Sequence, residues 1–144
     1  MKHLTLLFLA WCLQTAALSA QPAYEIWFTA GAVRHHGLIL AGNAGWQMRV
    51  KYHDAAHNCT RLIEQQLRAE ETSLGIRLYG HSVWDVINRR QTRDYAADRL
   101  YVYRDPQGNL YTRNLDDQGI SSGVVMKPLN AASLAEKMRE FEWN

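Results

Sequence analysis

Residues 38–52 read LILAGNAGWQMRVKY, a pattern typical of a β-hairpin. After the turn, apolar and polar residues alternate, and one face carries Trp46, Met48, Val50 and Tyr52. A period of two residues indicates a half-buried strand. Gly42-Asn43-Ala44-Gly45 is rich in residues that tolerate a positive φ, which favours a turn. If these four residues close the hairpin, Ile39 pairs with Met48 and Ala41 pairs with Trp46.

Strand patterns continue on both sides of this hairpin. Residues 24–30 alternate in the same way, and residues 76–83 indicate a further strand with Gly80 as a candidate bulge. Residues 59–74 fit either a long strand or a helix, because their residue types favour a helix while their alternation favours a strand. We favour the strand because strand patterns flank the segment. Residues 84–93 lose the pattern and indicate a loop or a short helical turn.

A second hairpin is predicted around Asp105-Pro106-Gln107-Gly108, which suits a type I turn between residues 99–104 and 109–114. A four-residue turn pairs Tyr103 with Leu110 and Val102 with Tyr111. One face then carries Tyr101, Tyr103, Leu110 and Thr112, and the other carries Leu100, Val102 and Tyr111. Both faces are largely apolar, which is more than a sheet with one solvent-exposed face requires.

The last residues change from strand to helix periodicity. Leu134, Met138 and Phe141 recur at helical spacing, and Ser133 with Glu136 offers a capping box. The predicted fold is therefore mainly β: an antiparallel β-sandwich or small β-barrel of about seven strands, with one short C-terminal helix.

Residues 1–20 have the three-part layout of a secretory signal peptide. A positive start, Met1-Lys2-His3, precedes an apolar run over residues 4–13, and small residues lead up to Ala20. That run is about half of the ~20 residues that span a bilayer. We therefore predict cleavage after Ala20, a secreted or periplasmic protein without a transmembrane anchor in the mature chain, and a single β-rich domain over residues 21–144. The alternative is a buried N-terminal strand or helix.

The charge balance argues against a nucleic-acid partner. The chain has 16 Lys and Arg against 14 Asp and Glu, and removing residues 1–20 takes away only one Lys. A nearly neutral chain has no net field to attract a polyanion. The expected partner is a small molecule or a protein.

Aromatic residues form the first candidate site. Tyr101 and Tyr103 on the second hairpin, with Trp46 and Trp84, could line a pocket in which the Tyr hydroxyls orient a ligand. The alternative is that a helix or a second sheet covers these side chains, so that they belong to the core.

His53, His57 and Cys59 form the second candidate site. Imidazole and thiolate are ligands that hold zinc or copper, and three ligands within seven residues would suit an open site. The alternative is a polar connecting turn, because no second cluster of ligands with matched spacing follows.

Three functions remain open from the sequence. The leading hypothesis is an exported, non-catalytic binding module for a small apolar or aromatic molecule or for a protein partner. The alternatives are a metal-dependent enzyme centred on His53 and His57, and an envelope or structural protein whose exposed aromatics form an interface. The chain lacks Gly-x-Ser-x-Gly, His-Glu-x-x-His and Gly-rich phosphate-loop motifs, which makes an enzyme the weaker hypothesis, and no cofactor is indicated.

Overall fold

The computed structural model describes residues 22–43, 45–115, 119 and 121–143. The predicted signal peptide lies outside these residues. The described chain forms ten strands and one helix: β1 (Ala23–Ala30), β2 (Val33–Gly42), β3 (Gly45–Asp54), β4 (Cys59–Thr72), β5 (Gly75–Asp85), β6 (Arg90–Gln91), β7 (Arg99–Arg104), β8 (Leu110–Leu115), β9 (Ser121–Gly123), β10 (Val125–Pro128) and α2 (Ala131–Glu140).

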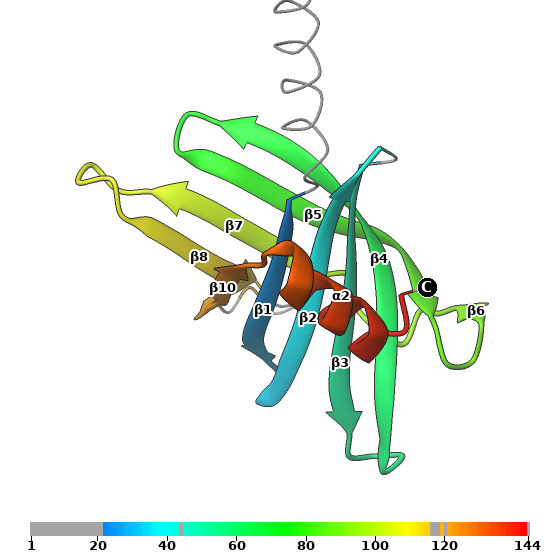
Figure 1. Cartoon of the computed structure of the whole chain (residues 1–144). Helices are drawn as coiled ribbons and strands as arrows, with labels where there is room; N and C mark the ends of the chain where they lie inside the picture. Colours follow the sequence, from blue (N-terminus) through cyan, green and yellow to red (C-terminus); the bar gives the residue numbers. More distant parts are fainter. Residues whose placement is uncertain (1–21, 44, 116–118, 120, 144) are drawn as a thin grey trace, which may run out of the picture.

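The strands form one antiparallel, barrel-like sheet that is nearly closed (Figure 1). Its strand order is β10-β1-β2-β3-β4-β5-β7-β8-β9, with β6 paired to β5. The chain closes the sheet by changing partners at Val124: β9 pairs with β8, and β10 pairs with β1. Closure of this kind leaves few unpaired strand edges.

The predicted fold class is confirmed, and so is the first hairpin. Ile39 pairs with Met48 and Ala41 pairs with Trp46, as the alternation predicts. Residues 59–72 form strand β4 and not a helix, because β3 and β5 pair with the segment on both sides. The strand count exceeds the predicted seven, because residues 90–91 pair as β6 and residues 121–128 add the two short strands β9 and β10.

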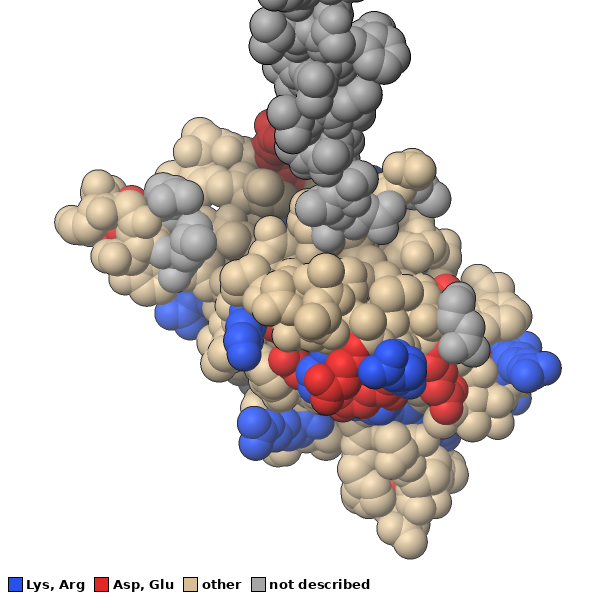
Figure 2. Space-filling model, in the orientation of Figure 1, with Lys and Arg blue, Asp and Glu red and all other residues tan. Residues whose placement is uncertain are grey.

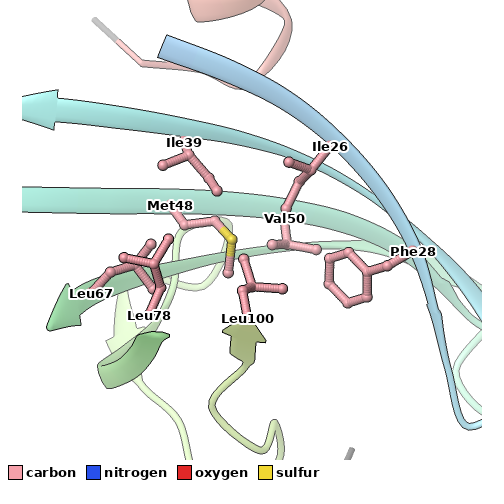
Figure 3. Packing of buried hydrophobic residues seen from close by; sticks show 8 residues of the cluster. All are labelled: Ile26, Phe28, Ile39, Met48, Val50, Leu67, Leu78 and Leu100. Carbon is pink, nitrogen blue, oxygen red and sulfur yellow. The ribbon is translucent and has the colours of Figure 1, made fainter. Parts of the chain in front are cut away.

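The interior of the barrel is the main hydrophobic core (Figure 3). Side chains from β1 to β5 and β7 point toward one another between the strands: Ile26, Phe28, Ile39, Met48, Val50, Leu67, Leu78 and Leu100. Each buried side chain of this kind stabilises the fold by about 1.5–3 kcal/mol relative to an exposed one.

A second hydrophobic cluster lies outside the barrel, where α2 covers β1 to β4 (Figure 1). Leu38 of β2 and Leu62 of β4 pack there against Phe141, which follows the helix. Asn130 caps the helix by accepting a hydrogen bond from the backbone N–H of Ser133, so the N-cap lies three residues before the Ser133 that the sequence predicted. Arg49 donates to the carbonyl oxygen of Phe141 and thereby satisfies a group that the helix end leaves free.

Charged side chains of both signs surround α2, and Figure 2 shows them interspersed on this face, with no patch of one sign. Glu25 on β1 is buried and binds Lys137 of α2 at 2.9 Å and His36 of β2 at 2.7 Å. Burial raises the pKa of Glu25, but the hydrogen bonds from Lys137 and His36 outweigh that effect and lower it overall. The Glu25–Lys137 pair links the helix to the barrel.

The predicted register of the second hairpin is wrong by one residue. Tyr103 pairs with Tyr111 instead of Leu110, and Val102 pairs with Thr112. The reason is Gly108, whose φ of +87° adds a residue to the turn and moves the closing pair to Asp105 and Asn109. Tyr101, Tyr103 and Tyr111 therefore share one face.

Strand β5 also differs from the sequence prediction at its bulge. The register with β4 shifts between Glu64 and Gln66, opposite Ser82, whose φ is +54°. The bulge therefore falls two residues after Gly80.

Candidate functional site

A cavity of about 460 Å³ lies at the end of the barrel where β1 and β2 are joined. Its wall comes from the β1–β2 turn, from β3, from the loop before β7, and from the ends of β8 and β9. The residues that line it are Thr29, Ala30, Gly31, Ala32, Val33, His35, Tyr52, Asp94, Tyr95, Ala96, Ala97, Asp98, Asn114, Leu115 and Ser122. A cavity of this volume is in the range of small-molecule sites.

An aromatic cluster forms one side of the cavity. The ring of His35 stacks between Phe28 and Tyr52, with centroid distances of 5.0 Å and 4.8 Å. Tyr95 from the loop before β7 approaches the same group and lies 5.4 Å from Tyr52. Cross-strand pairing explains the arrangement, because β2 places His35 opposite both Phe28 of β1 and Tyr52 of β3.

His35 is a buried, neutral imidazole. Its Nδ1 donates to the carbonyl oxygen of Val33 at 2.9 Å, so the neutral ring keeps Nε2 as an acceptor. Burial lowers the pKa of His35, and the hydrogen bond to Val33 opposes this only in part. Burial likewise raises the pKa of Tyr52, so its hydroxyl stays protonated and can donate or accept a hydrogen bond.

A buried hydrogen-bond network anchors the loop over the cavity. Gln65 of β4 donates from Nε2 to Oδ2 of Asp98 at 2.7 Å, and its Oε1 accepts from the Asp98 backbone N–H at 2.8 Å. The hydroxyl of Tyr95 donates to the same carboxylate oxygen at 2.8 Å. Gly80 makes room for this contact, since a Cβ there would lie 2.3 Å from Gln65 Oε1. The network holds Tyr95 and Asp98 against the barrel.

Asn114 lines the cavity with a side chain whose amide oxygen lacks a hydrogen-bond partner among the described residues. It is 1% exposed, and its Oδ1 accepts no hydrogen bond from any residue that the structure describes. Asn114 pairs with Leu100 of the core, so its side chain is on the inner face of β8. A buried acceptor without a donor is costly, and such groups call for a specific explanation.

Arg61 lies next to the cavity but is occupied by two carboxylates. It pairs with Tyr52 across the strands and donates to Asp54 and Asp85, each at 3.2 Å. Burial raises the pKa of Asp85, and the hydrogen bonds from Asn88 together with Arg61 lower it overall. The guanidinium charge is therefore balanced locally.

The four aromatic residues that the sequence suggested as ligand-binding do not come together. Tyr101 and Tyr103 lie on the outer face of β7, where Arg77 covers Tyr101 at 5.5 Å. Trp84 is exposed on β5, and Trp46 stacks on Tyr24 at 6.2 Å, at the barrel end opposite the cavity. None of the four lines the cavity described above.

The three suggested metal ligands are also spread apart. His53 pairs with Thr60, so His53 and Cys59 are on opposite faces of the sheet. His57 is in the β3–β4 turn, where its Nδ1 donates to Asp54 at 2.7 Å. Across the described ranges, no three His, Cys, Asp or Glu side chains group as a metal site would require. The metal-site hypothesis therefore rests on sequence alone.

None of the cavity residues was among the candidates that the sequence suggested, although the pattern around one of them could have found it. Extending the alternation back from Ile39 through Gly37 puts His35 on the core face, which is the signal that could have found it. Asp98 and Asn114 carry no such signal, because their place in the cavity depends on how the sheet closes.

Comparison with known proteins adds no functional information. No family model matches the chain, and neither a curated protein nor a solved structure matches it. Within the described part of the chain, no helix has the length and apolar character needed to cross a membrane. The function is therefore inferred from the chemistry of the cavity.

Proposed function

We propose that this protein is an exported binding module that holds a small organic molecule in the cavity at the β1–β2 end of the barrel. The observation that carries the proposal is Asn114, which lines a cavity of about 460 Å³ and whose buried Oδ1 accepts no hydrogen bond from the described residues. Aromatic faces beside it supply apolar contact area, and a few fixed polar groups supply orientation. This combination is typical of small-molecule sites.

The chemistry of His35 favours binding over catalysis. A catalytic imidazole needs a nucleophile or substrate proton on one nitrogen and an orienting group on the other. Here Nδ1 is held by a backbone carbonyl group, and both ring faces are covered by Phe28 and Tyr52. Of the described residues, none donates a hydroxyl or thiol hydrogen bond to this ring.

The binding function can be tested with N-phenyl-1-naphthylamine, a neutral dye whose fluorescence rises in apolar surroundings. The dye should bind saturably to the wild type. Ala97→Trp fills the cavity and should abolish that signal, whereas Ala135→Trp on the exposed face of α2 should leave it unchanged. A signal that does not saturate, or that both variants retain equally, contradicts the proposal.

Export is a separate part of the proposal and has its own test. Sequencing the N-terminus of the native protein should give Gln21 first, because the layout of residues 1–20 predicts cleavage after Ala20. An N-terminus that still carries Met1 contradicts export through a cleaved signal peptide.

A second candidate function is supported by the outer face of β7 and β8. Tyr103 stacks on Tyr111 at 5.8 Å and accepts a hydrogen bond from Arg113 at 2.9 Å. Tyr and Arg are enriched at protein interfaces. If this face joins copies of the chain, sedimentation should show association that rises with concentration and that Tyr111→Asp removes. A protein that stays monomeric at all concentrations contradicts self-assembly through this face.

A further inference from the structure

The described lining of the cavity has acidic and neutral groups but no basic ones. Asp94 is exposed at its open side, and Asp98 is 5% exposed in its wall. No Lys or Arg is among the described residues that line it. The exposed carboxylate of Asp94, with no basic side chain among the described residues of the lining, gives the cavity a negative charge, which favours a positively charged occupant.

The hydrogen-bonding groups are likewise biased toward accepting. Asn114 Oδ1 requires a donor, and neutral His35 keeps Nε2 as an acceptor. The hydroxyl of Tyr95 already donates to Asp98 and so is not available as a donor to a ligand. A ligand that carries several N–H groups fits this set better than a carboxylate or a phosphate, which can only accept.

The aromatic cluster also favours a positively charged ligand. Tyr52 and Tyr95 meet at 5.4 Å at the cavity wall, and the rings of tyrosine attract cations through their faces. The guanidinium of Arg61 does not cancel this attraction, because it is paired with Asp54 and Asp85.

We propose that the ligand is an organic cation, an aromatic or aliphatic amine whose ammonium group donates to Asn114 Oδ1. This inference rests on the proposed function, and it names the chemical class of the molecule bound in the same cavity. Asp94 supplies the complementary charge, and Tyr52 and Tyr95 contact the carbon skeleton.

The test uses three indole derivatives that differ mainly in charge: tryptamine is cationic, tryptophol is neutral and indole-3-propionate is anionic. Binding is followed by NMR on the isotope-labelled protein at neutral pH. Tryptamine should shift the resonances of cavity residues and bind about 10-fold more tightly than indole-3-propionate. Equal or tighter binding of the anion, or no binding of tryptamine at millimolar concentration, overturns the assignment of ligand class.

Two variants connect the result to the cavity. Asp94→Asn should weaken tryptamine binding about 3-fold and leave tryptophol binding unchanged. The control Glu71→Gln removes the same charge at an exposed position of β4 and should change the binding of neither probe. Asn114→Leu should weaken tryptamine about 10-fold. If Asp94→Asn weakens both probes equally, recognition of the positive charge is wrong.

The two proposals fail in different ways. If tryptophol or indole-3-propionate binds in the cavity and tryptamine does not, the ligand class is wrong and the binding function stands. If neither the indole probes nor N-phenyl-1-naphthylamine responds to Ala97→Trp, the binding function itself is wrong.

Discussion

Gln65 and Asp98 bind each other through two hydrogen bonds, 2.7 Å from the Gln65 amide to the carboxylate and 2.8 Å from the Asp98 backbone N–H to the amide oxygen. Gln65 is fully buried in the middle of β4, and Asp98 ends the loop that leads into β7. This reciprocal pair fixes the loop that carries Tyr95, and hence the shape of the cavity.

Gln65→Leu should therefore destabilise the protein. The substitution removes the Gln65 donor from the buried Asp98 carboxylate, which keeps its hydrogen bond from Tyr95, and it leaves the Asp98 backbone N–H without its acceptor. The loss should cost about 2–4 kcal/mol. Urea denaturation measures the change. Gln66→Leu, one residue along on the outer face, should change the free energy of unfolding by less than about 1 kcal/mol. Similar losses in the two variants would mean that the pair does not anchor the loop.

Asn114→Leu should change the stability in the opposite direction from Gln65→Leu. It replaces a buried acceptor that lacks a donor by an apolar group of similar shape, which should stabilise the ligand-free protein by about 1 kcal/mol. Asn114→Asp puts a charge at the same point and should destabilise it strongly. A Leu variant that is clearly less stable than the wild type would show that the Asn114 amide is satisfied in the native protein.

His35 makes stability depend on pH in a defined window. Its folded pKa is lowered from 6.5 by burial, so below about pH 6.5 the unfolded chain binds more protons and stability falls as pH falls toward the folded pKa. The carboxylates of Glu25 and Asp85, whose pKa values are lowered from 4.5 and 3.8, lose their contributions only at lower pH.

His35→Phe keeps an aromatic ring in the stack and removes the titrating group. Unfolding free energies measured from pH 7.5 to 5 should fall less steeply in this variant than in the wild type. Equal slopes would contradict the assignment of the neutral, buried imidazole.

Val50→Asp and Val125→Asp test the inner and outer faces of the barrel. Val50 is fully buried and Val125 is 64% exposed, although both are in strands. An unpaired charge in the core should cost about 4 kcal/mol or more, whereas the exposed substitution should cost less than about 1 kcal/mol. Thermal denaturation followed by circular dichroism separates them. Matching melting temperatures would place Val50 outside the core.

The sequence alone was sufficient where structure depends on neighbours along the chain. Alternation over residues 38–52 predicts both the faces and the register of the β2–β3 hairpin, because a strand's period and a short turn are local properties. The change of periodicity after residue 130 predicts the C-terminal helix for the same reason. Local signals were not sufficient for residues 59–72, where strand pairing on both sides overrides the helical preference of the residue types.

The site itself was decided only by the tertiary structure. His35, Gln65, Asp98 and Asn114 come from β2, β4, the loop before β7 and β8, and no spacing along the chain connects them. They meet because the sheet curves until residues 121–128 join β8 to β1, which turns one face of each strand into a shared interior. The alternation of each strand determines which side chains face inward. Closure of the barrel determines which of them become neighbours, because that depends on the pairing of every strand in the sheet.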